Sequence, residues 1–167
     1  MNTDLEWRKS TSQEWYTNEN VIKSVRNVLG EIELDPASCE FANQIVKAKT
    51  FYTASDDGLT KEWNGKIFIN PPFKRVKEFK NKLKESDYDE AILLTAGYYD
   101  RKWFQEILNE ADACCLIRGR LKHYNENVKI SQSASNFGHA IFYYGPDVNK
   151  FALEFKSYGT VVVRYTC

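Results

Sequence analysis

The chain has 167 residues, with 23 basic and 23 acidic side chains and 43% hydrophobic residues. This length predicts one domain, 1–167, without room for a separate substrate-recognition domain. Balanced charge argues against a strongly nonspecific nucleic-acid binder, which needs an excess of Lys and Arg. With no signal-peptide pattern and no long apolar run, we expect a soluble cytoplasmic protein without a membrane partner.

Helical and strand patterns alternate along the chain after a polar stretch, 1–13, that we expect to be flexible. The predicted elements are a helix over Asn18–Leu29 closed by Gly30, a strand over Glu31–Leu34, a helix from about Glu40 to Val46, an irregular stretch to Asn64, a strand over Lys66–Ile69, a helix over Val76–Lys84, a strand over Ala91–Thr95, a helix over Lys102–Glu110, a strand over Ala113–Ile117, a strand over Ser135–Tyr144, a short helix over Phe151–Phe155 and a strand over Thr160–Tyr165. This order predicts an α/β fold with a doubly wound, mostly parallel sheet.

The cysteines and histidines indicate neither a metal site nor a disulfide. No pair of the four cysteines has C-x-x-C spacing, and Cys114 and Cys115 lie in an apolar strand pattern, where they predict small core residues. His123 and His139 are in separate segments, so we assign neither a catalytic role.

The most informative run is Asn70-Pro71-Pro72-Phe73, directly after an apolar strand pattern. Two prolines make the chain leave the sheet in a stiff turn. A carboxamide and a freed carbonyl there can accept hydrogen bonds from an amino group, while an aromatic ring stacks on the plane that carries it. The simpler interpretation is a strand terminator with a core Phe. We favour a catalytic role.

An ordered set of motifs accompanies this run. It comprises Trp15-Tyr16-Thr17, Leu34-Asp35-Pro36-Ala37-Ser38, Phe51-Tyr52-Thr53, Asp57-Gly58-Leu59, Trp63, Gly65, Trp103-Phe104 and Arg118-Gly119-Arg120. From about Glu14 to Tyr144 the chain resembles phage-type, Dam-like DNA N6-adenine methyltransferases. The run at Asn70 resembles motif IV of amino-methyltransferases that use S-adenosylmethionine. The resemblance implies a Rossmann-like methyltransferase fold, this cofactor and DNA as partner.

The resemblance equates Asp35-Pro36-Ala37-Ser38 with the first cofactor motif, although the usual glycine-rich turn is absent. Asp35 and Asn70 both follow predicted strands, where open α/β sheets bind ligands. Asp35 can also be read as a helix cap or Asx turn. The segment Trp15-Tyr16-Thr17 is implied to close over the cofactor's methionine end, or it packs against the next helix as a hydrophobic staple.

Further cofactor contacts are implied at Tyr52 and Asp57. Asp56 and Asp57 compete for one acidic role near the adenosine or the target base, and we favour Asp57. Phe51 and Tyr52 flank the cofactor adenine or pack the sheet, and core packing accounts for at least one of them.

Basic residues follow two predicted strands. Lys74 and Arg75 come directly after the Asn70 run, and Arg118 and Arg120 surround a glycine after a later strand. Their positions predict contacts with DNA phosphate. A solvated helix face is the usual alternative for the first pair.

These features predict methyl transfer from S-adenosylmethionine to the N6 amino group of a flipped-out adenine in DNA. Asn70 and Pro71 are expected to accept hydrogen bonds from the amine, Pro72 to stiffen the turn and Phe73 to stack on the base. The alternatives are another planar amino acceptor, such as an RNA base or a protein glutamine, and a catalytically silent nucleic-acid-binding relative.

Overall fold

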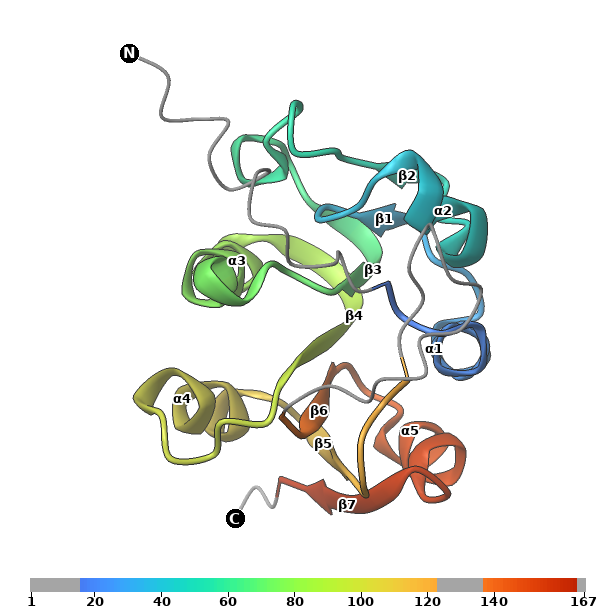
Figure 1. The fold of residues 1–167 in the computed structure, drawn as a ribbon, viewed down its shortest axis with the longest axis vertical. Coiled ribbons are helices and arrows are strands. Elements are labelled where there is room, and N and C mark those ends of the chain that lie inside the picture. The colour runs from blue at the N-terminus through green and yellow to red at the C-terminus, as the bar shows by residue number, and fades with distance from the viewer. Residues whose placement is uncertain (1–15, 123–136, 165–167) are drawn as a thin grey trace.

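In the computed structural model of the chain, residues 16–122 and 137–164 are described. These residues form a seven-stranded sheet in the order β2-β1-β3-β4-β6-β5-β7 (Figure 1). The strands are β1 Leu34–Asp35, β2 Thr50–Phe51, β3 Asn64–Ile69, β4 Asp87–Ala96, β5 Ala113–Ile117, β6 His139–Tyr144 and β7 Gly159–Val163. The helices are α1 Glu19–Leu29, α2 Glu40–Val46, α3 Val76–Glu85, α4 Lys102–Glu110 and α5 Val148–Phe155, with 3₁₀ turns η2 Gly58–Thr60 and η3 Phe73–Arg75.

Helices cover both faces of the sheet, so the expected α/β class is confirmed. Figure 1 shows α3 and α4 on one side and α1, α2 and α5 on the other. Each face carries its own apolar core: Phe68, Ile92 and Ile141 point toward α1 and α5, whereas Ile69 and Leu93 belong to the cluster with α3 and α4. Alternate residues of each strand therefore supply opposite cores, which explains the nearly continuous apolar strands of the sequence.

The strand order reverses between β1 and β3. β1 pairs in parallel with both β2 and β3, and β3 pairs in parallel with β4. At the other end β6 lies antiparallel between β4 and β5, and β7 is antiparallel to β5. Asp35 ends β1 and Asn70 follows β3, so both residues stand at the switch point where such sheets bind ligands.

Local side chains explain where the helices begin and end. The side chain of Asn18 accepts a hydrogen bond of 3.0 Å from the Val21 amide and caps α1, which ends at Gly30 with φ of 82°. Asp147 caps α5 in the same way by accepting from the Lys150 amide at 3.0 Å. The fifth helix is therefore three residues longer at its N-terminus than the apolar pattern predicts.

Several strand boundaries differ from those expected. β1 covers only Leu34–Asp35, and β7 ends at Val163. The stretch expected to be irregular contains β2 and η2, while β4 begins four residues early, at Asp87. β6 starts at His139; the expected residues Ser135 and Asn136 lie outside the described part of the chain. In the described residues, no helix is long and apolar enough to cross a bilayer.

Candidate active site

Asn70 stands at the carboxyl end of β3 with its side chain held in place. Its Nδ2 donates a hydrogen bond of 3.0 Å to Oγ1 of Thr17, a residue with only 5% of its surface exposed. Pro71 is buried and Pro72 exposed, and the chain then turns into η3 as the Arg75 amide donates to the Pro72 carbonyl at 2.8 Å. The turn of residues 70–73, called the Asn70 turn below, has the stiff exit from the sheet that the two prolines predict.

Phe73 does not belong to the core. Its surface is 47% exposed, and its ring meets that of Phe137 edge-on with centroids 4.6 Å apart. Phe137 in turn lies 5.7 Å from the Tyr98 ring and 5.3 Å from the His139 ring. The structure thus places Phe73 in a partly exposed aromatic group, which contradicts the simpler interpretation of this residue as core.

Sequence reasoning missed Tyr98 and Phe137. The two residues are brought together by antiparallel pairing of β4 with β6, in which Ala96 lies opposite His139. The adjoining glycines allow close approach, since the Gly97 amide donates to the Gly138 carbonyl at 2.8 Å and a Cβ at Gly97 would lie 3.2 Å from the Gly138 carbonyl carbon. An aromatic residue beside a glycine at a strand end was the available signal.

Asp35 is a buried carboxyl group at the end of β1. It is 3% exposed and accepts a hydrogen bond of 3.1 Å from the Ala37 amide. Burial raises the pKa of Asp35 from 3.8 to about 7, and the hydrogen bond from the Ala37 amide offsets only part of that effect. Asp35 does not cap α2, because Cys39 accepts the capping bond there, from the Ala42 amide at 3.4 Å. It does form the Asx-turn contact with Ala37.

The turn over Pro36–Ser38 is held by two neighbouring segments. The Ser38 amide donates to the Tyr52 carbonyl at 2.9 Å, and the Tyr52 amide donates to the Asp35 carbonyl at 3.0 Å. On another side Gly58 lies so near that a Cβ there would be 2.1 Å from the Pro36 carbonyl oxygen. Trp63 fixes this approach by donating from Nε1 to the Gly58 carbonyl at 2.8 Å. Because Gly58 has no side chain, its backbone packs directly against the Pro36 carbonyl, in a chain whose first motif contains no glycine.

The adjacent acids Asp56 and Asp57 have different partners. Asp56 accepts hydrogen bonds from the amide and the hydroxyl of Thr53, at 2.8 and 2.7 Å, which lower its pKa. Asp57 has a left-handed backbone with φ of 48°, and its Oδ1 lies 3.6 Å from an Arg75 guanidinium nitrogen. The Asp56 carboxylate thus accepts its hydrogen bonds within its own turn, whereas the Asp57 carboxylate faces the segment after the Asn70 turn.

The segment before α1 connects three parts of the site. Tyr16 is buried with its ring 5.0 Å from that of Phe41, Thr17 contacts Asn70, and Asn18 donates from Nδ2 to the Lys122 carbonyl at 3.0 Å. The Arg118-Gly119-Arg120 segment is thereby tied to the start of α1. Trp15, predicted to act with these residues, lies outside the described part of the chain.

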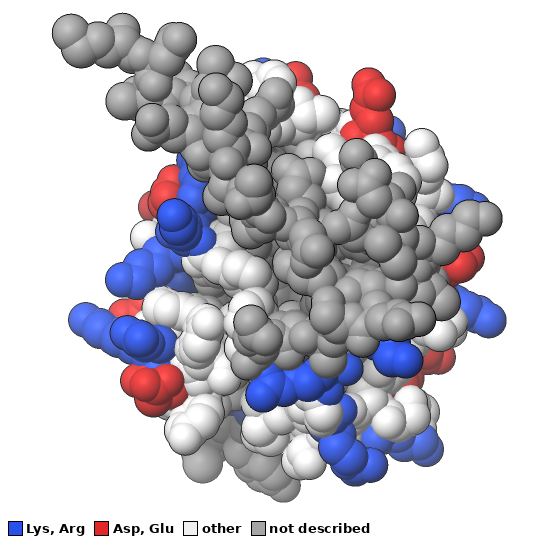
Figure 2. Space-filling view, viewed as in Figure 1, with Lys and Arg blue, Asp and Glu red and all other residues white. Residues whose placement is uncertain are grey.

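The four predicted DNA contacts differ in their surroundings. Lys74, Arg118 and Arg120 are exposed, whereas Arg75 pairs with Glu78 at 2.9 Å and with Asp57. Gly119 has φ of 75°, so the arginines flank a turn that favours glycine for its backbone angle. Figure 2 shows a group of Lys and Arg side chains just below the centre of the face drawn there, and further groups toward its lower right and left edges.

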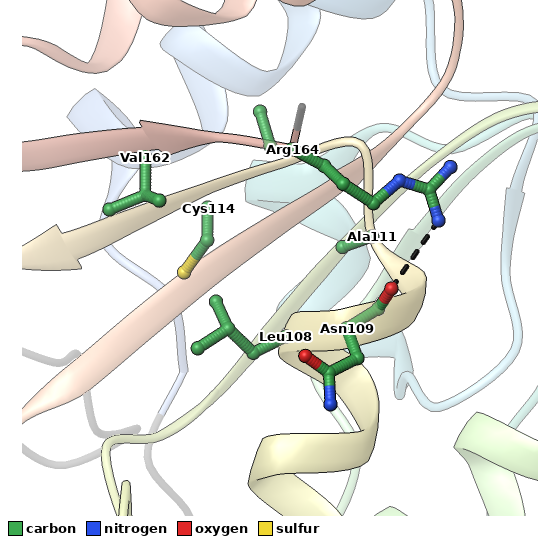
Figure 3. Close-up of a pocket in the computed structure, with 7 residues that line it drawn as sticks. Leu108, Asn109, Ala111, Cys114, Val162 and Arg164 are labelled. Atoms are coloured by element: carbon green, nitrogen blue, oxygen red, sulfur yellow. Dashed lines mark hydrogen bonds between the residues drawn. The ribbon is translucent and has the colours of Figure 1, made fainter. Parts of the chain in front are cut away.

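A pocket of about 250 Å³ lies elsewhere, between the end of α4 and strands β5 and β7 (Figure 3). Its lining includes Leu108, Cys114 and Val162, together with Arg164, which donates to the Asn109 carbonyl at 3.3 Å and pairs with Asp112 at 3.0 Å. Ala111 and Ala113 place this pocket at the amino end of β5. The candidate site lies at the carboxyl ends of the strands, so the two are separate.

The cysteines and possible metal ligands show no further reactive centre. Burial raises the pKa of Cys114 to about 12 and that of Cys115 to about 11, which makes both thiols unreactive core groups. Cys39, Cys114 and Cys115 are free thiols. The described residues contain no group of three His, Cys, Asp or Glu side chains placed to hold a metal ion.

The family model described as DNA N-6-adenine-methyltransferase (Dam) matches residues 5–162, nearly the whole chain. The chain belongs to this family. Among the curated proteins none matches. The family's model covers the Asn70 turn, the Asp35 turn and the Arg118 segment, so the resemblance read from the ordered motifs is confirmed.

Among solved structures, the fold is similar to a dimethyladenosine transferase from Plasmodium falciparum, with a TM-score of 0.51 and 11% sequence identity. The match covers 83% of this chain and 65% of the transferase, so the chain spans about two thirds of that protein's length. At this identity the likeness concerns the fold, and it confirms the expected methyltransferase-type α/β architecture.

Proposed function

We propose that this protein transfers a methyl group from S-adenosylmethionine to the N6 amino group of adenine in DNA. The observation that carries the proposal is the orientation of Asn70. Because Nδ2 is spent on the buried Thr17, Oδ1 is the atom of the carboxamide that can accept a hydrogen bond from an amino group. Membership of the Dam family supports adenine in DNA as the acceptor.

The Asn70 turn provides what an amino group needs in order to react. The lone pair of N6 is delocalised into the ring, so the neutral amine is a weak nucleophile. Hydrogen bonds from N6 to Asn70 Oδ1 and the Pro71 carbonyl stabilise the positive charge that develops on nitrogen. The half-exposed Phe73 ring offers a face for the base, and Phe137 meets it edge-on. No covalent intermediate is required, and because the methylated nitrogen is positively charged and strongly acidic, its surplus proton can pass to water after the transfer without a dedicated general base.

The residues around Asp35 fit the cofactor. When bound, S-adenosylmethionine supplies an electrophilic methyl group. Asp35 is a buried carboxyl group, and no neighbouring cation lowers its pKa. The cationic amino group of the cofactor would be a matching partner for its carboxylate form. The turn over Pro36–Ser38 and the side chains of Tyr16, Thr17, Tyr52 and Asp57 complete the proposed cofactor site; the Ala37 and Ser38 amides are bound within the protein, to Asp35 and to the Tyr52 carbonyl. Gly58 takes over the close packing that a glycine-rich turn provides in relatives.

DNA binding is assigned to the basic residues at the same edge of the sheet. Lys74 follows the Asn70 turn, and Arg118 and Arg120 are joined to the start of α1 through Asn18 and Lys122. Phosphate contacts at these points hold the strand beside Phe73 without reading its sequence. Arg75 contributes only when its pairs with Asp57 and Glu78 open.

The decisive experiment is transfer of labelled methyl groups to unmethylated DNA, with the modified base identified after digestion to nucleosides. Asn70→Ala should lower turnover by roughly 10²–10³, the loss typical of one group that acts on the transition state, and leave cofactor affinity nearly unchanged. Asn27→Ala removes the same side chain from an exposed position at the far end of α1 and is the matched control. Label in cytosine, RNA or protein would contradict the proposal, as would an Asn70→Ala enzyme as active as the parent. Absence of saturable cofactor binding would identify a silent relative.

A further inference from the structure

We infer that Tyr99 stacks on a nucleobase of the DNA strand that carries the target adenine, outside the pocket at Phe73. The inference rests on the proposed function and adds a substrate contact to it. The Tyr99 ring is 73% exposed, more than any other large hydrophobic side chain of the described residues. The side chain of Tyr99 is therefore open to solvent, and its aromatic face can stack on a planar ligand.

The turn that carries Tyr99 is fixed on both sides. The Arg101 amide donates to the Tyr98 carbonyl at 3.0 Å, and the side-chain amide of Gln105, in α4, donates to the Tyr99 carbonyl. Before the turn, the Gly97 amide is bound to the Gly138 carbonyl. The exposed ring therefore projects from a held backbone, so stacking would cost little backbone entropy.

A sequence of ring contacts joins this turn to the Asn70 turn. Phe73 meets Phe137 at 4.6 Å, and Phe137 meets Tyr98 at 5.7 Å. Tyr98 is 40% exposed and directly precedes Tyr99. Tyr99 is thus one residue along the chain from this ring group, and among the described residues it makes no ring contact of its own with it. This position suits a base that neighbours the target adenine.

The charges around the turn favour a nucleic-acid strand over an apolar protein partner. Arg101 and Lys102, two and three residues after Tyr99, are exposed, and the Lys102 side chain is 91% exposed, with a weak pair to Glu106 at 3.9 Å. One acid, Asp100, lies in the same turn, so the three residues 100–102 carry a net positive charge. An aromatic face next to cations is the combination that binds single-stranded nucleic acid.

Two measurements test this contact: a crosslinking experiment with the wild-type protein and a kinetic comparison of Tyr99 variants. Wild-type protein is irradiated with DNA that contains 5-iododeoxyuridine beside adenines, and the crosslinked peptide is mapped; Tyr99 should carry the crosslink. In the methyl-transfer assay Tyr99→Ala should raise the KM for DNA by about 5- to 150-fold, the cost of losing one stacked base, while Tyr99→Phe stays within about twofold. Cofactor affinity should not change in either variant. Leu153→Ala, at a 65% exposed position of α5, is the control.

The two proposals fail in different ways. A wild-type protein that methylates DNA while Tyr99→Ala keeps the parent KM, or a crosslink that maps to other peptides only, overturns the role of Tyr99 and leaves the proposed function intact. A wild-type protein that transfers no methyl group to DNA overturns the proposed function. In that case the crosslink and the DNA affinity of Tyr99→Ala still decide whether this residue contacts nucleic acid.

Discussion

Asn70 Nδ2 donates a hydrogen bond of 3.0 Å to Thr17 Oγ1, although the two residues are 53 positions apart in the chain. The contact joins the segment before α1 to the end of β3. It orients a carboxamide that would otherwise rotate freely, and a fixed orientation is what lets a hydrogen-bonding group act on a transition state without reorganisation. We therefore expect Thr17 to position Asn70, in addition to its predicted place near the cofactor.

Replacing Thr17 separates these two roles. Thr17→Val keeps the shape but removes the hydroxyl, so we expect kcat to fall by about tenfold or more, the effect of removing one hydrogen bond to a buried group, while any rise in the Kd for S-adenosylmethionine measures the proposed cofactor contact separately. Thr17→Ser keeps the hydroxyl and should retain most of the activity. Steady-state kinetics with both substrates varied measures the effect. A higher KM for S-adenosylmethionine at unchanged kcat would instead assign Thr17 to cofactor binding alone.

Asp35 should make cofactor binding depend on pH. Its pKa of about 7 means that the carboxylate form, which pairs with a cationic amine, grows from a minor to the major species between pH 6 and pH 8. We expect affinity for S-adenosylmethionine to rise by about tenfold over this range. Asp35→Asn should bind more weakly by roughly 1.5–3 kcal/mol at pH 8 and lose this part of the pH dependence. Calorimetry at several pH values tests both, and parallel pH profiles for parent and variant would remove Asp35 from the site.

The same carboxyl group should reduce stability at high pH. Its pKa is raised in the folded state, so its contribution is fully present below pH 3.8 and is lost as the pH rises to about 7. A change from 3.8 to about 7 corresponds to roughly 4 kcal/mol. Asp35→Asn should therefore be more stable than the parent at pH 8, with the difference disappearing near pH 4. Urea unfolding at the two pH values measures this, and a variant less stable at pH 8 would contradict it.

Lys74 and Arg75 are adjacent, but their substitution should affect different ligands. Lys74→Ala removes an exposed cation and should reduce the salt dependence of DNA binding by about one unit of log–log slope. Arg75→Ala releases Asp57, whose Oδ1 lies 3.6 Å from it, and should change cofactor affinity more than the DNA salt slope. Filter binding over a salt series and calorimetry with the cofactor separate the two effects. An equal reduction of the salt slope in both variants would show that Arg75 also contacts phosphate.

Arg118 and Arg120 should contact phosphate and not bases. Changing either one to Ala should weaken binding to every DNA sequence tested and reduce the salt slope by about one unit for each phosphate that is no longer neutralised. Lys49→Ala is the control, because Lys49 is exposed at the amino end of β2, paired with Glu31 at 2.7 Å. An Arg118 or Arg120 variant with altered sequence preference and an unchanged salt slope would speak against this role.

The sequence predicted the parts of the site that follow directly from a strand. Asp35 and Asn70 each follow a predicted strand, and the rule for open α/β sheets brings them to one edge. Tyr98 and Phe137 could not be found in this way, because their neighbourhood depends on the antiparallel pairing of β4 with β6. Strand β2 was not predicted because its two residues are too few to show a periodicity. The first half of β4 was not predicted because its acidic residues have weak strand propensity, although it pairs with β3 from Asn64 onward.

Gly58 changes how glycine-poor members of such a family should be judged. A side chain at position 58 would clash with the Pro36 carbonyl. The position that must lack a side chain is therefore in a loop more than twenty residues after the turn that follows β1. The absence of glycine from the first turn is therefore not by itself evidence against close packing there, because Gly58 and the hydrogen bond from Trp63 supply that packing from a later loop.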